Sequence, residues 1–183
     1  MPMLTQLRQD HANMARLLHV LAIKHKTLDH GERPDFHLVR EVVDYILDYM
    51  TGFTVPLERI CSEQLLTKVP EANTLGCRLA EDYQALNERL ARLSQDIDMI
   101  LMDAVVPMDR FADDLKAYLD AHRAYLRAER EELFPLMREY LDEEEMQVLA
   151  DSLPEGAQAE LERLQEAYPE LYTEFRNAPS PLA

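Results

Sequence analysis

The sequence predicts an all-α protein, an up-down-up-down antiparallel four-helix bundle with short additional C-terminal helices. The composition is one reason: the chain has four glycines and no tryptophan among 183 residues, and it is rich in residues that lose little side-chain freedom in a helix. The spacing of apolar residues is another, because they recur every three or four positions along four long segments. The length suits one hydrophobic core. We expect the bundle over residues 1–141, a helical extension over 142–177 and a frayed tail over 178–183.

The first helix is predicted to run from about Leu4 to Asp29. Its apolar residues step by three and four along one face, and the segment HGERP then ends it with a glycine and a proline. His11 falls within this apolar stripe.

The second helix is predicted from Asp35 to about Met50. The segment TGFTVP follows, and its Gly and Pro are expected to bend or break the helix before LERICSEQLL resumes it. Glu58 lies on the inner face of the resumed part.

The third and fourth helices are predicted over about Ala72 to Met102 and from Pro107 to about Tyr140. The third has a regular leucine and isoleucine seam in which Tyr83 occupies one position, a pattern typical of antiparallel bundles. Pro107 suits the first turn of the fourth helix. The apolar face of the fourth helix also contains three polar or aromatic residues: His122, Tyr125 and Glu129.

The remaining residues are acidic and form shorter apolar patterns. DEEEMQVLADSLPEG predicts one short helix, and AQAELERLQEAYPELYTEF predicts another with Tyr168, Leu171 and Phe175 among its apolar residues. We expect these helices to dock on the bundle, on a second copy in a homodimer or on a protein partner.

The formal net charge of −16 argues against two classes of partner. Nucleic acids and anionic membrane surfaces are bound by clustered Lys and Arg. No segment approaches the roughly 20 apolar residues that a membrane span needs, and charges interrupt the N-terminus where a signal peptide would be apolar. We therefore expect a cytoplasmic protein that binds neither nucleic acid nor membrane.

One polar layer is predicted inside the bundle. In an antiparallel arrangement His11, Glu58, Tyr83 and Glu129 lie at the same level, and Tyr125 shares a helical face with Glu129 at the i, i+4 spacing. Carboxylates and imidazoles from four helices form the sites in which bundles hold di-iron or related metals.

Four segments resemble the motifs of hemerythrin-like, or HHE cation-binding, domains: LRQDHANM, TVPLE, LAEDYQAL and YLRAEREELFPLM. In that family one His comes from the first helix, His-x-x-x-Glu from the second, a His from the third and His-x-x-x-Glu from the fourth. His11, Glu58 and Glu129 match this pattern. The three remaining histidine positions are replaced, by Thr54, Tyr83 and Tyr125, so the resemblance implies the fold and a remodelled or lost metal site.

Two interpretations of the layer follow. In the first, His11, Glu58, Glu129, Tyr83 and Tyr125 bind iron, mononuclear or dinuclear, with phenolate oxygen in place of imidazole. In the second, no cofactor is obligatory: phenol hydroxyls donate to the carboxylates and a protonated His11 balances part of their charge. His122, one turn before Tyr125, could act as a substitute nitrogen ligand or as a half-buried, hydrogen-bonded histidine.

Three functions are compatible with these residues. One is a non-enzymatic sensor, binding or regulatory protein descended from an iron-binding bundle, and oxygen carriage is not expected. Another is an iron-binding oxidase or peroxidase-like enzyme with tyrosinate ligands. The third is a metal-free interaction module whose function lies on an exposed apolar patch, for which the segment Tyr168 to Phe175 is the candidate. The sequence shows no nucleophile or general base, which favours the first and third.

Overall fold

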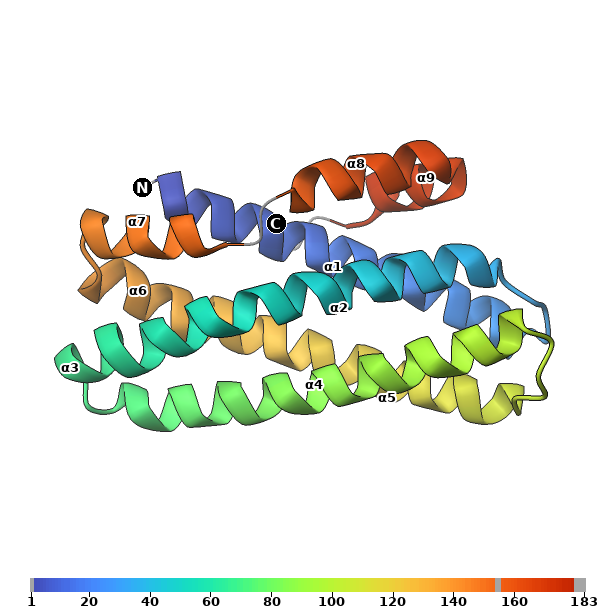
Figure 1. The fold of residues 1–183 in the computed structure, drawn as a ribbon, viewed down its shortest axis with the longest axis horizontal. Coiled ribbons are helices and arrows are strands. Elements are labelled where there is room, and N and C mark those ends of the chain that lie inside the picture. The colour runs from blue at the N-terminus through green and yellow to red at the C-terminus, as the bar shows by residue number, and fades with distance from the viewer. Residues whose placement is uncertain (1, 154–155, 180–183) are drawn as a thin grey trace.

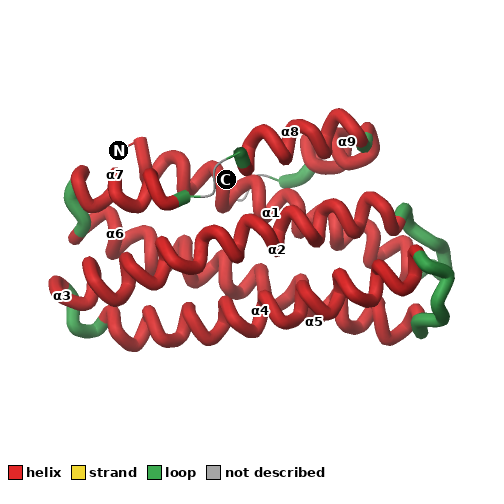
Figure 2. Tube along the Cα trace, in the orientation of Figure 1, coloured by secondary structure: helices red, strands yellow, loops and turns green. Residues whose placement is uncertain are grey.

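The protein is an antiparallel helical bundle with additional helices along one side (Figure 1). The structure, a computed structural model, describes residues 2–153 and 156–179, with the side chains of residues 5–53, 63–153 and 156–179. All regular structure in these residues is helical, and short loops join the helices (Figure 2). None of the described helices combines the length and apolar character that a membrane span requires.

Four long rods form the bundle. They are α1 (Pro2–Asp29), α2 (Phe36–Arg59), α4 (Ala72–Leu101) and α5 (Met108–Ala128). Along the ring α1 packs on α2, α2 on α4, α4 on α5 and α5 back on α1, and successive rods run in opposite directions (Figure 1). The leucine and isoleucine seam of α4 is buried as predicted, including Leu79, Leu86, Leu90, Leu93 and Ile97.

The second rod differs from the prediction. The helix does not break at the TGFTVP segment: α2 continues through it to Arg59, a π-helical segment follows over Ile60–Leu65, and α3 adds Leu66–Lys68. The φ angle that Pro56 imposes is itself helical, so the proline costs mainly a missing N–H and crowding of the carbonyl four residues earlier. Extensive packing of α2 along α4 offsets that cost.

The fourth rod also contains a π-helical segment. After α5, residues Glu129–Leu133 are π-helical, and α6 (Phe134–Tyr140) continues the rod. The Phe134 N–H donates to the Glu129 carbonyl, five residues back. Pro135 has no N–H for an α-helical bond, and the wider turn before it accommodates this loss.

Three further helices cover the side formed by α1 and α2. They are α7 (Glu143–Ser152), α8 (Ala157–Ala167) and α9 (Pro169–Asn177). The prediction of one helix over residues 157–175 is wrong, because the chain is extended at Tyr168 and α9 begins with Pro169. A residue before proline is disfavoured in the α conformation.

The last helix, α9, is held on α1 by a buried lysine. Lys24 has 2% of its surface exposed, and its ammonium donates to Glu170 and, at 2.9 Å, to Glu174. The Arg16 guanidinium lies 5.6 Å from the centre of the Phe175 ring. The extension therefore docks on its own bundle through paired charge as well as apolar contact.

Candidate functional site

The predicted polar layer lines a small, partly open cavity of about 30 Å³. The structure brings together the described predicted site residues at its wall: His11, Tyr83, His122, Tyr125 and Glu129. Glu58 and Thr54 lie in the last turns of α2, and their side chains are outside the described part. A cavity of this size has room for one or two water molecules.

His11 is buried and hydrogen-bonded across the bundle. Its Nε2 lies 2.8 Å from the carbonyl oxygen of Leu126 on α5. Because a carbonyl only accepts, Nε2 bears the hydrogen and donates it. Burial is the main cause that lowers the pKa of His11, and Arg130 lowers it further. The lowered pKa favours a neutral His11 imidazole at pH 7, whereas the second interpretation of the layer has a protonated His11.

His122 is paired with a tyrosine on its own helix. Its Nδ1 lies 2.7 Å from the Tyr118 hydroxyl, and both side chains are fully buried. Burial, and then repulsion from His11, lowers the pKa of His122 to about 3, while burial raises the pKa of Tyr118 well above its usual value. Both groups are neutral, and one imidazole nitrogen is occupied by this bond.

Glu129 begins the π-helical segment and lines the cavity. It is 7% exposed, and burial raises the pKa of its carboxyl group to about 8. Burial disfavours the charged form, so the group is mostly a neutral carboxylic acid at pH 7. A protonated carboxyl group is a poor metal ligand.

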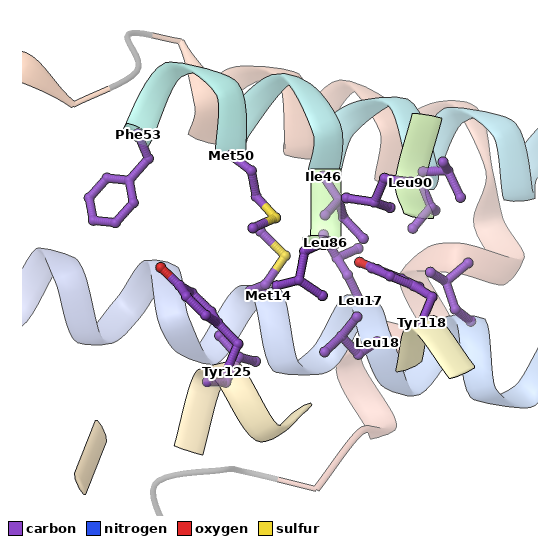
Figure 3. Packing of buried hydrophobic residues seen from close by; sticks show 14 of the residues in the cluster. Met14, Leu17, Leu18, Ile46, Met50, Phe53, Leu86, Leu90, Tyr118 and Tyr125 are labelled. Carbon is purple, nitrogen blue, oxygen red and sulfur yellow. The ribbon is translucent and has the colours of Figure 1, made fainter. Parts of the chain in front are cut away.

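Tyr83 and Tyr125 fill the side of the cavity between α4 and α5. Their rings meet edge to face with centroids 6.0 Å apart, and the His122 ring lies 6.2 Å from that of Tyr125. Figure 3 shows Tyr125 reaching from α5 into the core beside Met14 and toward Phe53. Two aromatic rings therefore form the wall of the cavity between α4 and α5.

Residues 3–137 match the family model described as the hemerythrin HHE cation binding domain, which covers most of the chain. The chain belongs to the hemerythrin-like family. No curated protein and no solved structure matched the chain significantly. The hemerythrin-like assignment confirms the resemblance based on the four sequence motifs.

The described side chains at the cavity of this hemerythrin-like chain do not fit the di-iron centre that the family implies. Among residues with described side chains, no three His, Cys, Asp or Glu side chains converge closely enough to hold a metal ion. The two imidazoles at the cavity each use one nitrogen within the protein, and the described carboxyl group of Glu129 is largely protonated. Both imidazoles are therefore held by hydrogen bonds within the protein.

Sequence reasoning missed two polar residues at this cavity. Asp10 and Tyr49 line it, and the Tyr49 hydroxyl donates to Asp10 at 2.9 Å. Gln6 donates to the other Asp10 oxygen at 2.8 Å. Burial raises the pKa of Asp10, and these two bonds oppose the rise. The position of Asp10 directly before His11 in the sequence could have indicated that Asp10 also lies near the cavity.

Proposed function

We propose that this chain is a non-enzymatic binding or regulatory protein of the hemerythrin-like family, in which the layer that holds iron elsewhere in the family serves as a hydrogen-bonded core. One observation supports the proposal most strongly. The imidazoles of His11 and His122 are neutral and bonded to Leu126 and Tyr118 instead of converging on one point. A core whose polar groups are bonded within the protein keeps its fold without a metal.

A second candidate is a site for a single ferric ion with tyrosinate ligands. The reason to consider it is that Tyr83, Tyr125 and Glu129 all reach the same cavity, and phenolate and carboxylate oxygens suit hard cations. Binding would require loss of protons from groups that the buried surroundings keep neutral. Iron-dependent oxidase or peroxidase activity would depend on this second candidate.

Metal analysis separates the two candidates. The full chain is purified without chelator or affinity metal, then examined by elemental analysis, visible spectroscopy and thermal unfolding with and without added iron. We expect less than stoichiometric iron, no tyrosinate-to-iron absorption band and an unchanged unfolding midpoint. Stoichiometric iron with that band would overturn the proposal and establish the ferric site.

Restoring the family's histidines tests the assignment of the layer. The triple variant Thr54→His, Tyr83→His, Tyr125→His supplies three imidazoles at the positions of the family pattern and should bind iron at least about tenfold more tightly than the wild type. Tyr172→His adds an imidazole on exposed α9 and serves as the matched control. If the triple variant and the control bind iron equally weakly, the assignment of these positions is wrong.

A further inference from the structure

The connection between α4 and α5 presents an unusual exposed apolar surface. Met102 is 81% exposed and Val105 is 93% exposed. With Met99 and Met108, which are also exposed, they form what we call the methionine tip. The only other exposed large apolar residues in the described part of the chain are Val148 and Tyr172. Clustered exposed apolar residues mark interaction surfaces.

The backbone holds the methionine tip in a defined shape. The Ala104 N–H donates to the Met99 carbonyl at 2.9 Å and the Asp103 N–H to the Ile100 carbonyl at 3.1 Å, the two bonds of a Schellman helix end. Asp103 has a left-handed φ of 59°. Val106 is buried as an anchor. The exposed side chains are thus presented by an ordered turn, which lowers the entropic cost of binding.

Acidic residues flank the methionine tip. Asp103 and Asp109 form no ion pair with described residues, whereas Asp98 lies 3.6 Å from Arg40, and Arg110 lies 3.3 Å from Asp96. Two carboxylates next to the tip therefore have no cationic partner among the described residues, on a chain with a formal net charge of −16. Such a field attracts basic partners and repels anionic membrane surfaces.

We infer that the methionine tip is the docking surface for an amphipathic helix of a partner protein, one with apolar residues on one face and Lys or Arg beside them. Methionine suits this role because its flexible, polarisable side chain adapts to an apolar helix face. Asp103 and Asp109 supply the charge complement for the partner's basic residues. The inference goes beyond the proposed function and holds whether or not the polar layer binds metal.

The test measures binding of a labelled probe by fluorescence anisotropy. The probe is a synthetic amphipathic helical peptide of leucine and lysine, compared with a scrambled peptide of identical composition. The full-length wild type should bind the amphipathic peptide about tenfold more tightly than the scrambled one. Met102→Ser with Val105→Ser should lower affinity about tenfold or more, because two apolar side chains lose their contact without any change of charge.

Matched variants make the result decisive. Val148→Ser with Tyr172→Ser removes the two exposed apolar residues elsewhere and should leave affinity within about twofold. Asp103→Asn with Asp109→Asn should weaken binding and reduce its salt dependence. Equal affinity for both peptides, equal loss in the two serine variants, or no binding by the wild type would overturn the inference. So would tip-dependent binding to phosphatidylcholine and phosphatidylglycerol vesicles, which would identify a membrane surface.

Discussion

Individual buried polar residues show how this bundle stays folded around a polar layer. Each imidazole is neutral and keeps one strong bond, His11 to the Leu126 carbonyl and His122 to Tyr118. Burying a neutral, bonded group costs far less than burying an ion. The carboxyl group of Glu129 also stays neutral, because its pKa is raised to about 8 and it keeps its proton below that pH.

Glu129 should make the protein less stable as pH rises. Its folded pKa of about 8 lies above the unfolded value near 4.5, so the folded state binds the extra proton, and the stability linked to it is lost as pH rises from about 4.5 to 8. Glu129→Gln, which stays neutral, should remove this loss. Urea unfolding at pH 5 and pH 8 should show the wild type losing on the order of a few kcal/mol relative to the variant.

Glu131→Gln is the control for that measurement, because Glu131 is exposed two residues further along the same rod. Equal pH dependence in wild type and Glu129→Gln would show that the Glu129 carboxyl is already ionised in the folded protein. His122 acts in the opposite sense. Its folded pKa of about 3 lies below the ordinary value of 6.5, so its contribution is lost as pH falls below 6.5.

At the scale of the elements, the C-terminal helices are held by charge that is itself buried. Lys24 on α1 is enclosed between Glu170 and Glu174 of α9, and burial raises the pKa of Glu174 while Lys24 opposes the rise. Removing both acceptors would leave a buried ammonium without a counterion, which is strongly unfavourable. Lys24 therefore adds a buried ion pair to the apolar contacts that dock α9 on α1.

Glu170→Gln with Glu174→Gln should release the last two helices. Hydrogen exchange should become faster in α8 and α9, while the seam residues of α4 keep their protection. Glu162→Gln with Glu166→Gln, on the exposed side of α8, is the control and should leave exchange unchanged. Uniformly faster exchange throughout the chain would instead mean that this ion pair supports the whole fold.

Apolar spacing predicted the long helices well because burial enforces the helical period, as along the seam of α4. The apolar spacing did not predict local features such as the end of a helix or a side-chain hydrogen bond. The spacing of three and four continues across Tyr168 and Pro169, so the end of α8 was hidden although the Tyr-Pro pair signalled it. At the candidate site, the i, i+4 spacing of Tyr118 and His122 is compatible with one helical face but does not predict their hydrogen bond, because pairing depends on rotamers and neighbouring helices.

For the whole molecule, a net charge of −16 sets the long-range electrostatics. Most described ion pairs lie on the surface and contribute little, whereas repulsion among excess carboxylates acts over the whole chain. Salt screens that repulsion beyond about 8–10 Å. The thermal stability of the protein should therefore increase with ionic strength.

The thermal unfolding midpoint should rise by several degrees when sodium chloride increases from about 10 mM to about 200 mM, as the Debye length shortens from about 30 Å to below 10 Å. Scanning calorimetry at constant pH measures the change. Potassium chloride at equal ionic strength should give the same shift, since screening does not depend on the cation. A falling midpoint would show that attractive ion pairs outweigh the net repulsion.

The π-helical segment at Glu129–Leu133 is a place where the chain can lose one residue without disrupting the core. A π turn holds one residue more than an α turn, so it amounts to a one-residue insertion confined to a single turn. Elsewhere in this rod, loss of one residue would rotate everything downstream by about 100° and carry Phe134 and Met137 out of the core. Within Glu129–Leu133 the same deletion would turn the segment back into an ordinary helix with both flanks still facing inward. A relative one residue shorter here would therefore keep the bundle intact.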